Sequence, residues 1–378
     1  MKNIISYLQQ HSGEILSDIK TLVAAESPSM NKAAVDRCGD VLQALFAERL
    51  GIDAEIDVQE HYGNHLKFTL GSGSDQTVVL GHFDTVWDEG ELPMRKEDGK
   101  FYGPGILDMK AGLVQSIWAA RALKEHDLLA GKRIVFLCGS DEEVGSPSSS
   151  EWLSRHALGS SQVLVVEPAV AGTGALKVAR KGTGQYQIAI TGQAAHAGNN
   201  PEEGISAVQE MAHQVLFLHG LNAPDRGTTV NVGIAQGGNR INVVADKAIL
   251  GIDTRVTSEE EAQRIHAEIT QIQPHLPGIK LEITGAQSRP PMRQSAESLV
   301  IMQRAQAVAQ QIGFSVDGQS VGGGSDGNFT AALGIPTLDG LGATGAGIHA
   351  RPEPVIIADI ASRTSLLAGL MLRDVQVA

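Results

Sequence analysis

Residues 78–84 read Val78-Val79-Leu80-Gly81-His82-Phe83-Asp84, an apolar run that ends in an imidazole and a carboxylate. Two more continuous apolar runs occur later, at Ile134-Val135-Phe136-Leu137 and Val163-Leu164-Val165-Val166. Such runs are typical of strands that are buried on both faces of a sheet. Between the first two runs, residues 112–126 place their apolar side chains at helical spacing. Strands that alternate with helices in this way predict an α/β domain with a largely parallel sheet.

The pattern of elements changes near residue 177. From there the order is strand, helix, strand, strand, helix, strand, which is the ferredoxin-like βαββαβ arrangement. After Arg289-Pro290-Pro291 the α/β pattern resumes. The simplest organisation is one α/β domain, residues 1–176 and 290–378, interrupted by an inserted domain at residues 177–289. The elements expected in and after the insertion span residues 178–191, 205–218, 228–235, 248–255, 259–272, 279–283, 297–312 and 356–372.

Composition excludes several classes of partner. The 378 residues carry 30 Lys and Arg against 43 Asp and Glu, a formal charge of −13. This balance argues against nucleic acid or an anionic membrane, because both need a clustered basic face. The N-terminal residues resemble an amphipathic helix and not a signal peptide, and Cys38 and Cys138 cannot form a disulfide framework. We therefore expect a cytoplasmic protein whose partner is a small molecule.

Acidic or imidazole side chains follow each apolar run. His82 and Asp84 follow the first, Asp141-Glu142-Glu143 follow the second, and Glu167 follows the third. Because the carboxyl ends of strands line the ligand crevice in open α/β sheets, we expect these groups to converge. The simpler alternatives are a solvated first helical turn for the acidic triplet and an N-cap for Asp108. A buried cluster of carboxylates would repel itself without cations, so the pattern favours a metal site.

A serine hydrolase is a separate possibility. Gly323-Gly324-Ser325-Asp326-Gly327 matches the nucleophile elbow G-x-S-x-G. Asp339 and His349 follow in the hydrolase order of serine, acid and histidine. This hypothesis leaves the acidic strand ends unexplained, and we keep it as an outside alternative.

Taken in order, these segments resemble the aminoacylase/glutamate carboxypeptidase family of di-zinc metallopeptidases. The resemblance covers nearly the whole chain, although Trp87 stands where many members have a proline and Ala111 where they have a glycine. It implies a zinc-exopeptidase-like catalytic domain with a mixed, largely parallel sheet and an inserted ferredoxin-like lid and dimerisation domain. The matching segments are His82-Phe83-Asp84, the G-x-G-x-x-D-x-K segment that ends at Asp108 and Lys110, Glu142-Glu143, Glu167-Pro168, His196-Ala197-Gly198, Gly322-Gly323-Gly324-Ser325-Asp326 and His349.

The same resemblance implies two zinc ions per subunit of a homodimer. Asp108 would bridge the ions, with His82 and Glu167 at one site and with Glu143 and His349 at the other. Each zinc would then have three protein ligands and a fourth position for a shared water, and cobalt or manganese would also suit these ligands. Three further residues would serve catalysis: Asp84 by orienting its neighbouring histidine, Glu142 as the general base, and His196 by reaching across the dimer interface towards the substrate carbonyl.

Within the family, the likeness is greatest to the bacterial folate-cleaving glutamate carboxypeptidases. Their pocket for a C-terminal glutamate uses an asparagine and two arginines, which Asn242, Arg255 and Arg289 match in position, with Gly324 and Ser325 beside them. Arginine binds a carboxylate through a planar fork, although most arginines pair only with a local surface acid. We expect an amidohydrolase that releases C-terminal glutamate from an N-acyl conjugate. The alternatives are a deacylase or carbamoylase of another N-acyl amino acid and a non-catalytic metal-binding relative.

Overall fold

The structure is a computed structural model that describes residues 1–373, and it divides into two compact units. Unit 1 comprises residues 1–179, 294–321 and those from 325 onward, and unit 2 comprises residues 180–293 and 322–324. The sequence placed these boundaries at 177 and 289. The first boundary lies later because Leu176–Arg180 (β8), of which all but the last residue belongs to unit 1, pairs with Gly318–Val321 (β13) of that unit in a short sheet.

Unit 1 is built on a six-stranded sheet with the strand order β1-β2-β6-β3-β7-β14. β6, β3, β7 and β14 are parallel, whereas β1 and β2 pair antiparallel at one edge. The prediction of an α/β fold with a mixed, largely parallel sheet is confirmed. The three apolar runs lie in the central strands β3, β6 and β7. The six strands are β1 (Ala54–Asp57), β2 (His65–Gly71), β3 (Asp75–His82), β6 (Lys132–Gly139), β7 (Gln162–Val165) and β14 (Thr337–Leu338).

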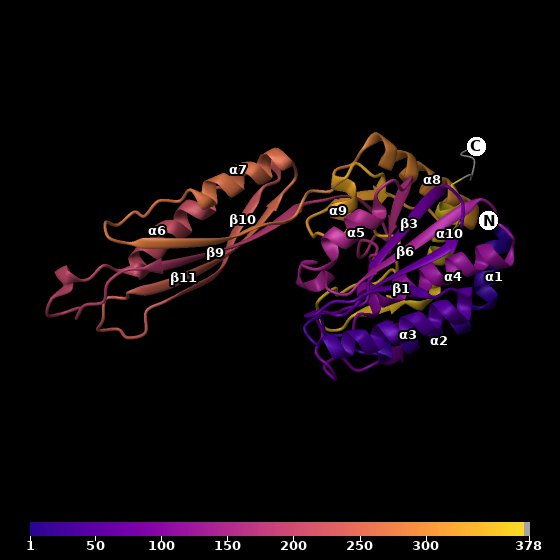
Figure 1. Cartoon of the computed structure of the whole chain (residues 1–378), viewed down its shortest axis with the longest axis horizontal. Helices are drawn as coiled ribbons and strands as arrows, with labels where there is room; N and C mark the ends of the chain where they lie inside the picture. The colour runs from indigo at the N-terminus through magenta and orange to yellow at the C-terminus, as the bar shows by residue number, and fades with distance from the viewer. Residues whose placement is uncertain (374–378) are drawn as a thin grey trace. The chain divides into compact units, whose positions relative to one another are not determined.

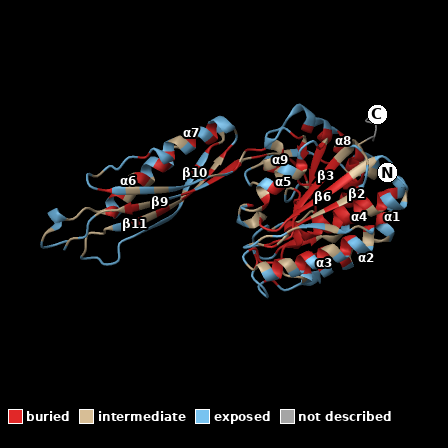
Figure 2. Ribbon diagram, in the orientation of Figure 1, coloured by how far each residue is buried: buried red, intermediate tan, exposed pale blue. Residues whose placement is uncertain are grey.

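Helices cover both faces of this sheet (Figure 1). Successive strand residues point to opposite faces, so Val79 packs into the larger core while Val78 and Leu80 pack with Trp152 on the other side. α5 and α9 cover the second face, and the remaining long helices of unit 1 cover the first. Figure 2 shows the resulting burial of β3 and β6. The helices are α1 (Lys2–Gln10), α2 (Ser12–Ala24), α3 (Lys32–Leu50), α4 (Ala111–Glu125), α5 (Ser149–Ala157), α8 (Ala296–Ile312), α9 (Gly327–Ala332) and α10 (Ile360–Leu372).

A three-stranded sheet also belongs to unit 1. It consists of β15 (Pro354–Ile356), β5 (Lys100–Tyr102) and β4 (Arg95–Glu97) in that order. Residue 356 was expected to begin a helix. The structure differs because residues 354–356 pair with β5 and Ile357–Asp359 form a 3₁₀ turn, so α10 begins only at Ile360.

Unit 2 is a four-stranded antiparallel sheet with the order β10-β11-β9-β12. Both of its helices pack against one face in a single core that includes Ile188, Leu218 and Ile265. This is the βαββαβ ferredoxin-like fold that the sequence predicted. The single strand expected at 178–191 is two strands, because the chain leaves β8 at Arg180 and enters β9 at Gly182. The elements are β9 (Gly182–Thr191), α6 (Ala207–Gly220), β10 (Thr229–Gly237), β11 (Lys247–Val256), α7 (Glu259–Thr270) and β12 (Lys280–Arg289).

Across residues 1–373, no helix combines the length and the apolar character that crossing a membrane would need.

Candidate metal centre

Five predicted metal ligands converge in unit 1. His82 ends β3, Glu143 lies in the 3₁₀ turn after β6, and Glu167 follows β7, so three parallel strands deliver side chains to the same edge of the sheet. Asp108 comes from the turn before α4, and His349 from the loop between β14 and β15. Asp108 is not an N-cap, because α4 begins at Ala111 and has no side-chain cap.

Asp108 lies between two groups of side chains. Its Oδ1 is 3.2 Å from His82 Nε2, which in turn is 3.5 Å from Glu167 Oε1. Its Oδ2 is 3.5 Å from His349 Nε2, which is 2.9 Å from Glu143 Oε2. Each carboxylate oxygen of Asp108 therefore faces a different histidine and acid. This is the arrangement that one bridging carboxylate and two cations would require.

Burial and charge together make this cluster attract positive charge. The Asp108, Glu143 and Glu167 side chains are each less than a tenth exposed. Burial and the charge of Asp108 raise the pKa of Glu143 to about 7. Hydrogen bonds with Asp108 and Glu143 raise the pKa of His349 to about 11. Burial opposes a charge on His82, yet its hydrogen bonds with Asp108, Asp84 and Glu167 raise the pKa of that imidazole well above its usual range.

The residues fit a metal centre. His82, Asp108 and Glu143 offer ligand atoms that all lie within 4.8 Å of one another. Glu143 Oε1 is buried and has no hydrogen-bond partner among residues 1–373, which is costly for a carboxylate unless a cation binds it. Imidazole nitrogens and carboxylate oxygens are donors that zinc, cobalt and manganese all accept. The donor set therefore supports bound divalent ions without selecting one metal.

Asp84 joins the two strand ends that carry the site. It is fully buried, and its Oδ1 lies 3.3 Å from His82 Nδ1. The same carboxylate accepts the backbone N–H groups of Glu142 and Glu143 at 3.2 Å each, and the hydroxyl of Ser29 at 2.7 Å. Burial works against the charge on Asp84, but the hydrogen bond from His82 holds the pKa of this carboxyl below its usual range. Asp84 thus fixes the imidazole and the acidic turn together.

Glu142 lies beside the ligand cluster. Its Oε2 is 4.0 Å from His82 Nε2, and its side chain is 12% exposed, which leaves room for contact with a water or a substrate. The turn that carries it is also held by Asp141, whose carboxylate accepts hydrogen bonds from Ser148 and Ser149. Sequence reasoning named Asp141 only as part of an acidic triplet. In the sequence, only the two serines seven and eight residues later indicate that Asp141 could hold this turn through hydrogen bonds.

Two predicted residues of unit 2 lie on adjacent segments. The backbone N–H of Ala197 donates to the carbonyl oxygen of Asn242 at 3.0 Å. His196 is exposed, and its Nδ1 accepts the N–H groups of Gly198 and Asn199 at 3.1 and 3.0 Å. Because Nδ1 is an acceptor, the ring proton of the neutral imidazole lies on Nε2. His196 therefore presents an N–H donor on its other side.

The two predicted arginines flank one residue of β9. Thr183 pairs with Arg255 of β11 on one side and with Arg289 of β12 on the other. A Cβ atom on Gly324 would lie 3.0 Å from Arg289 Cδ, so this glycine packs closely against that side chain. Arg255 binds Asp253 through two hydrogen bonds of 2.8 Å, which is the local ion pair considered as its simpler explanation.

Ser325 is fully buried, and its hydroxyl donates to Asp339 Oδ2 at 2.6 Å. The N–H of Gly327 donates to the same hydroxyl. His349, the histidine that a serine hydrolase would need as its base, faces Asp108 and Glu143 instead. This geometry argues against the serine esterase alternative.

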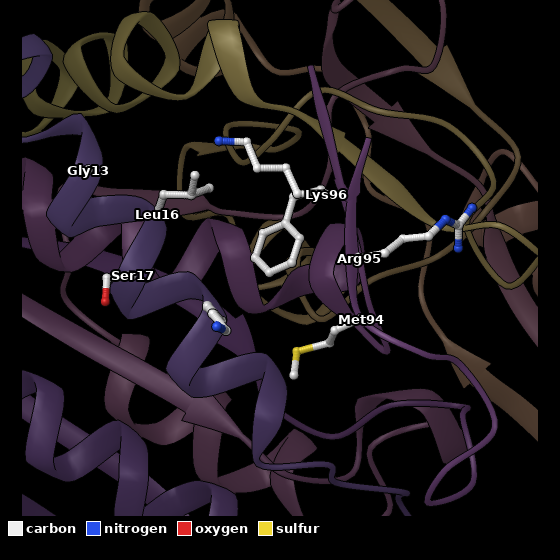
Figure 3. A pocket seen from close by; sticks show the side chains of 8 residues that line it. Gly13, Leu16, Ser17, Met94, Arg95 and Lys96 are labelled. Carbon is white, nitrogen blue, oxygen red and sulfur yellow. The ribbon is translucent and has the colours of Figure 1, made fainter. Parts of the chain in front are cut away.

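A hollow of about 400 Å³ also occurs in unit 1, between α2 and the strands β4 and β5. Leu16, Met94 and Lys96 line it (Figure 3). None of the predicted site residues lines this hollow. The candidate site is therefore identified by its histidine and carboxylate side chains and not by this cavity.

A buried histidine and carboxylate cluster at the carboxyl edge of an α/β sheet, with a further acid beside it, is an arrangement typical of metal-dependent hydrolases. The sequence pattern of peptidase family M20/M25/M40 matches residues 78–373, and the chain belongs to this family. The recognition of the family, and with it a hydrolase of peptide or amide C–N bonds, is therefore confirmed.

Relatives and solved structures agree with this assignment. Carboxypeptidase G2 of Pseudomonas sp. (strain RS-16) is 29% identical over 95% of this chain and 88% of its own length. Acetylornithine deacetylase of Proteus mirabilis (strain HI4320) is 28% identical over 68% of this chain and 72% of its own. The M20 family metallo-carboxypeptidase Sso-CP2 from Sulfolobus solfataricus superposes with a TM-score of 0.79 at 15% identity, covering 95% of this chain and 98% of its own. Bacillus subtilis YXEP, a dinuclear metal binding peptidase from the M20 family, has a TM-score of 0.70 at 14% identity, with 97% and 98% covered.

Proposed function

We propose that this chain is a two-zinc hydrolase that cleaves the amide bond of an N-acyl amino acid or peptide and releases a C-terminal glutamate. The observation that carries the proposal is the position of Asp108, whose two oxygens face separate groups of ligands. His82 and Glu167 would complete one zinc site, and Glu143 and His349 the other. The likeness to carboxypeptidase G2 supports the release of a C-terminal amino acid.

Glu142 is the proposed general base. Bound zinc ions would lower the pKa of a water and polarise the scissile carbonyl. Glu142 would take one proton of the attacking water as the water oxygen adds to the carbonyl carbon, and would later deliver this proton to the nitrogen of the leaving amine as the C–N bond breaks. Asp84 supports this role by binding the backbone N–H of Glu142. The presence of this acid beside the ligands disfavours a non-catalytic relative.

His196 is proposed to stabilise the oxyanion from the neighbouring subunit of a homodimer. Its Nδ1 accepts two backbone N–H groups, so its Nε2–H is available as a donor. A preorganised donor of this kind stabilises the tetrahedral intermediate. In a two-fold dimer the contribution is reciprocal, because each subunit donates the residue that it also receives.

Exposed apolar side chains of unit 2 support the dimer. Val208, Leu216 and Phe217 of α6 are 37%, 75% and 41% exposed, and Ile234 of β10 is 53% exposed. β10 is also an edge strand of its sheet, so its outer backbone groups are available for pairing. Exposed apolar residues beside an open strand edge are typical of a protein interface. We propose a second copy of this chain as the partner, joined through unit 2.

The proposed glutamate pocket uses Asn242, Arg255 and Arg289, with Gly324 and Ser325 beside them. The alignment of Arg255 and Arg289 on either side of Thr183 supports a shared carboxylate site. One observation favours a second candidate. Asp253 forms an ion pair with Arg255 and offsets its positive charge. A pocket with this pair could therefore accept a substrate with a neutral or basic C-terminal amino acid as well as one with glutamate. A deacylase or carbamoylase of another N-acyl amino acid is therefore the alternative, and the acetylornithine deacetylase relative supports it.

The test is hydrolysis of a panel of N-acyl amino acids in which the amino acid and the acyl group vary separately. We expect acidic C-terminal residues to give the highest kcat/KM. We also expect a chelator to abolish turnover and zinc, cobalt or manganese to restore it, whereas Asp108→Asn should not recover. Preference for neutral or basic amino acids would favour the second candidate, and activity that survives complete metal removal would overturn both.

A cytoplasmic location is part of the proposal. Cys38 and Cys138 are both buried and free. Reduced cysteines are usual in the reducing environment of the cytoplasm. Localisation of the tagged chain by fractionation would test it.

A further inference from the structure

Glu353 is a buried carboxylate that the proposed chemistry does not use. It follows His349 by four positions and is 1% exposed. Its Oε1 accepts the backbone N–H groups of Leu107 and Asp108, at 2.8 and 3.0 Å. Its Oε2 accepts the indole N–H of Trp87 at 2.5 Å. Three donors thus meet one carboxylate, and such charge-assisted hydrogen bonds are the strong ones.

These contacts join three segments that carry metal ligands. Trp87 lies five residues after His82, residues 107–108 contain the proposed bridging ligand, and Glu353 closes the loop that begins with His349. The first two segments also pack tightly, because a Cβ atom on Gly105 would lie only 2.2 Å from Thr85 Cγ2. Glu353 therefore ties the backbone of Asp108 both to the strand of His82 and to the loop of His349.

The position of Asp108 is more demanding than that of any other proposed ligand. Its two oxygens must face two ligand groups at once, so a small shift of its backbone changes both sites. Residues that hold metal ligands in place typically contribute 10–100-fold, as an order of magnitude, to metal affinity.

We propose that Trp87 and Glu353 form a positioning pair that sets the Asp108 carboxylate and the His349 loop for binding the metal ions. Trp87 holds Glu353, and Glu353 holds the Leu107–Asp108 backbone. Neither residue is a ligand or a catalytic residue. The inference rests on the proposed two-metal site. It adds to that site the residues that hold Asp108, the ligand shared by both ions, in position.

The first test is Trp87→Phe, which keeps an aromatic ring but removes the donor. Trp118→Phe is a matched control, because Trp118 is also a buried tryptophan of unit 1 and donates its indole N–H to the buried carboxylate of Asp18 at 2.8 Å. The readout is the affinity of the purified apo chain for zinc, titrated against a competing chelator. We expect Trp87→Phe to weaken the affinity of at least one ion by about 10-fold or more, and Trp118→Phe to leave both affinities unchanged.

A second variant separates positioning from folding. Glu353→Gln keeps the size of the side chain, and its amide oxygen can still accept the N–H groups of Leu107 and Asp108. Its NH₂ group then opposes the indole N–H of Trp87, since both are donors. In the double variant Trp87→Phe/Glu353→Gln this opposition is removed. We expect the double variant to bind zinc more tightly than Glu353→Gln alone, a rescue that a loss of general stability would not produce.

The outcomes distinguish this inference from the proposed function. A wild-type chain that binds no metal would overturn both. A wild-type chain that binds two ions, with Trp87→Phe binding them equally well, would overturn the positioning pair alone. Equal losses in Trp87→Phe and Trp118→Phe, or no rescue in the double variant, would also overturn it.

Discussion

The two sheets of this molecule bury their strands to different extents. The central sheet of unit 1 is covered by helices on both faces, and the acids and imidazoles at its strand ends are largely buried. The sheet of unit 2 has its helical core on one face only, and predicted residues such as His196 and Asn242 are exposed. A buried charge must find a countercharge, whereas an exposed one is solvated and free to pair locally. The chemistry of unit 1 can therefore be inferred from burial, whereas burial gives no such evidence for the exposed residues of unit 2.

The largest expected effect is that of Glu142→Gln in unit 1. This change keeps the shape of the side chain but removes the proposed base, so turnover should fall by at least about 10²-fold and by up to about 10⁴-fold. Both metal ions should remain bound, because Glu142 is not a proposed ligand. Steady-state kinetics and metal content measured on the same preparation would check this.

Glu143→Gln is the matched control for that experiment, since it changes the neighbouring acid of the same turn. We expect Glu143→Gln to lose metal as well as activity, because it removes a proposed ligand. Near-normal turnover of Glu142→Gln with full metal content would contradict the assignment of the base.

The second effect concerns His196 in unit 2. Removing one oxyanion donor typically lowers kcat by about 10²–10³-fold, so His196→Ala should be nearly inactive. If the histidine acts in the neighbouring subunit, His196→Ala and Glu142→Ala should complement each other. Random exchange of subunits would make half of the dimers mixed, and each mixed dimer would have one intact active site out of two. Roughly a quarter of all active sites would therefore be intact.

The complementation result is decisive only if exchange is verified. Mass spectrometry of differently labelled subunits would show the mixed dimer. Mixed dimers without recovered activity would exclude action in trans, and a chain that stays monomeric would exclude the dimer itself.

The sequence was most informative where side chains follow buried strands. His82, Glu143 and Glu167 could be placed together because parallel strands end at one edge of a sheet. Glu353 was not predicted, because its contacts depend on three loops that are distant in sequence. The Asp253–Arg255 pair was recognised only as a general alternative, since residues two apart on a strand share a face but need not interact. The break between β8 and β9 falls at Lys181, beside Gly182 and Gly184, and these glycines were included in one continuous expected strand.

A smaller effect is expected from Arg255→Ala. If Arg255 binds a substrate carboxylate, its loss should reduce kcat/KM for acidic substrates far more than for neutral ones. The matched control is Asp253→Asn, which releases Arg255 from its local ion pair and should not weaken the binding of an acidic substrate. Kinetics with paired glutamate and glutamine conjugates would separate the two. An equal loss for both substrates would make Arg255 structural.

The smallest expected effect concerns Glu261, a buried acid of unit 2, and tests whether buried acids of the two units differ in their need for a metal. Glu261 is 8% exposed, like the proposed ligands of unit 1, but its partners are Arg264, Thr228 and Arg226 of its own unit. Hydrogen bonds from Arg264 are the main cause that lowers the pKa of Glu261 from an ordinary 4.5 to about 2. A carboxylate that already has cationic partners needs no metal. We therefore expect its loss to affect stability and not metal content.

The sign of the pH dependence follows from the lowered pKa. Glu261 contributes stability that is fully present above about pH 4.5, the unfolded value, and is lost as the pH falls towards about 2, the folded value. Glu261→Gln should lower the free energy of unfolding of unit 2 by about 1 kcal/mol at pH 7, and the difference from the wild type should vanish once the pH is below about 2. Denaturant-dependent hydrogen exchange of peptides from α7 would measure it, with the exposed Glu268→Gln on the same helix as the control. A pH-independent difference would mean that Glu261 acts through its shape, and a loss of bound metal in Glu261→Gln would break the distinction between buried acids in the two units.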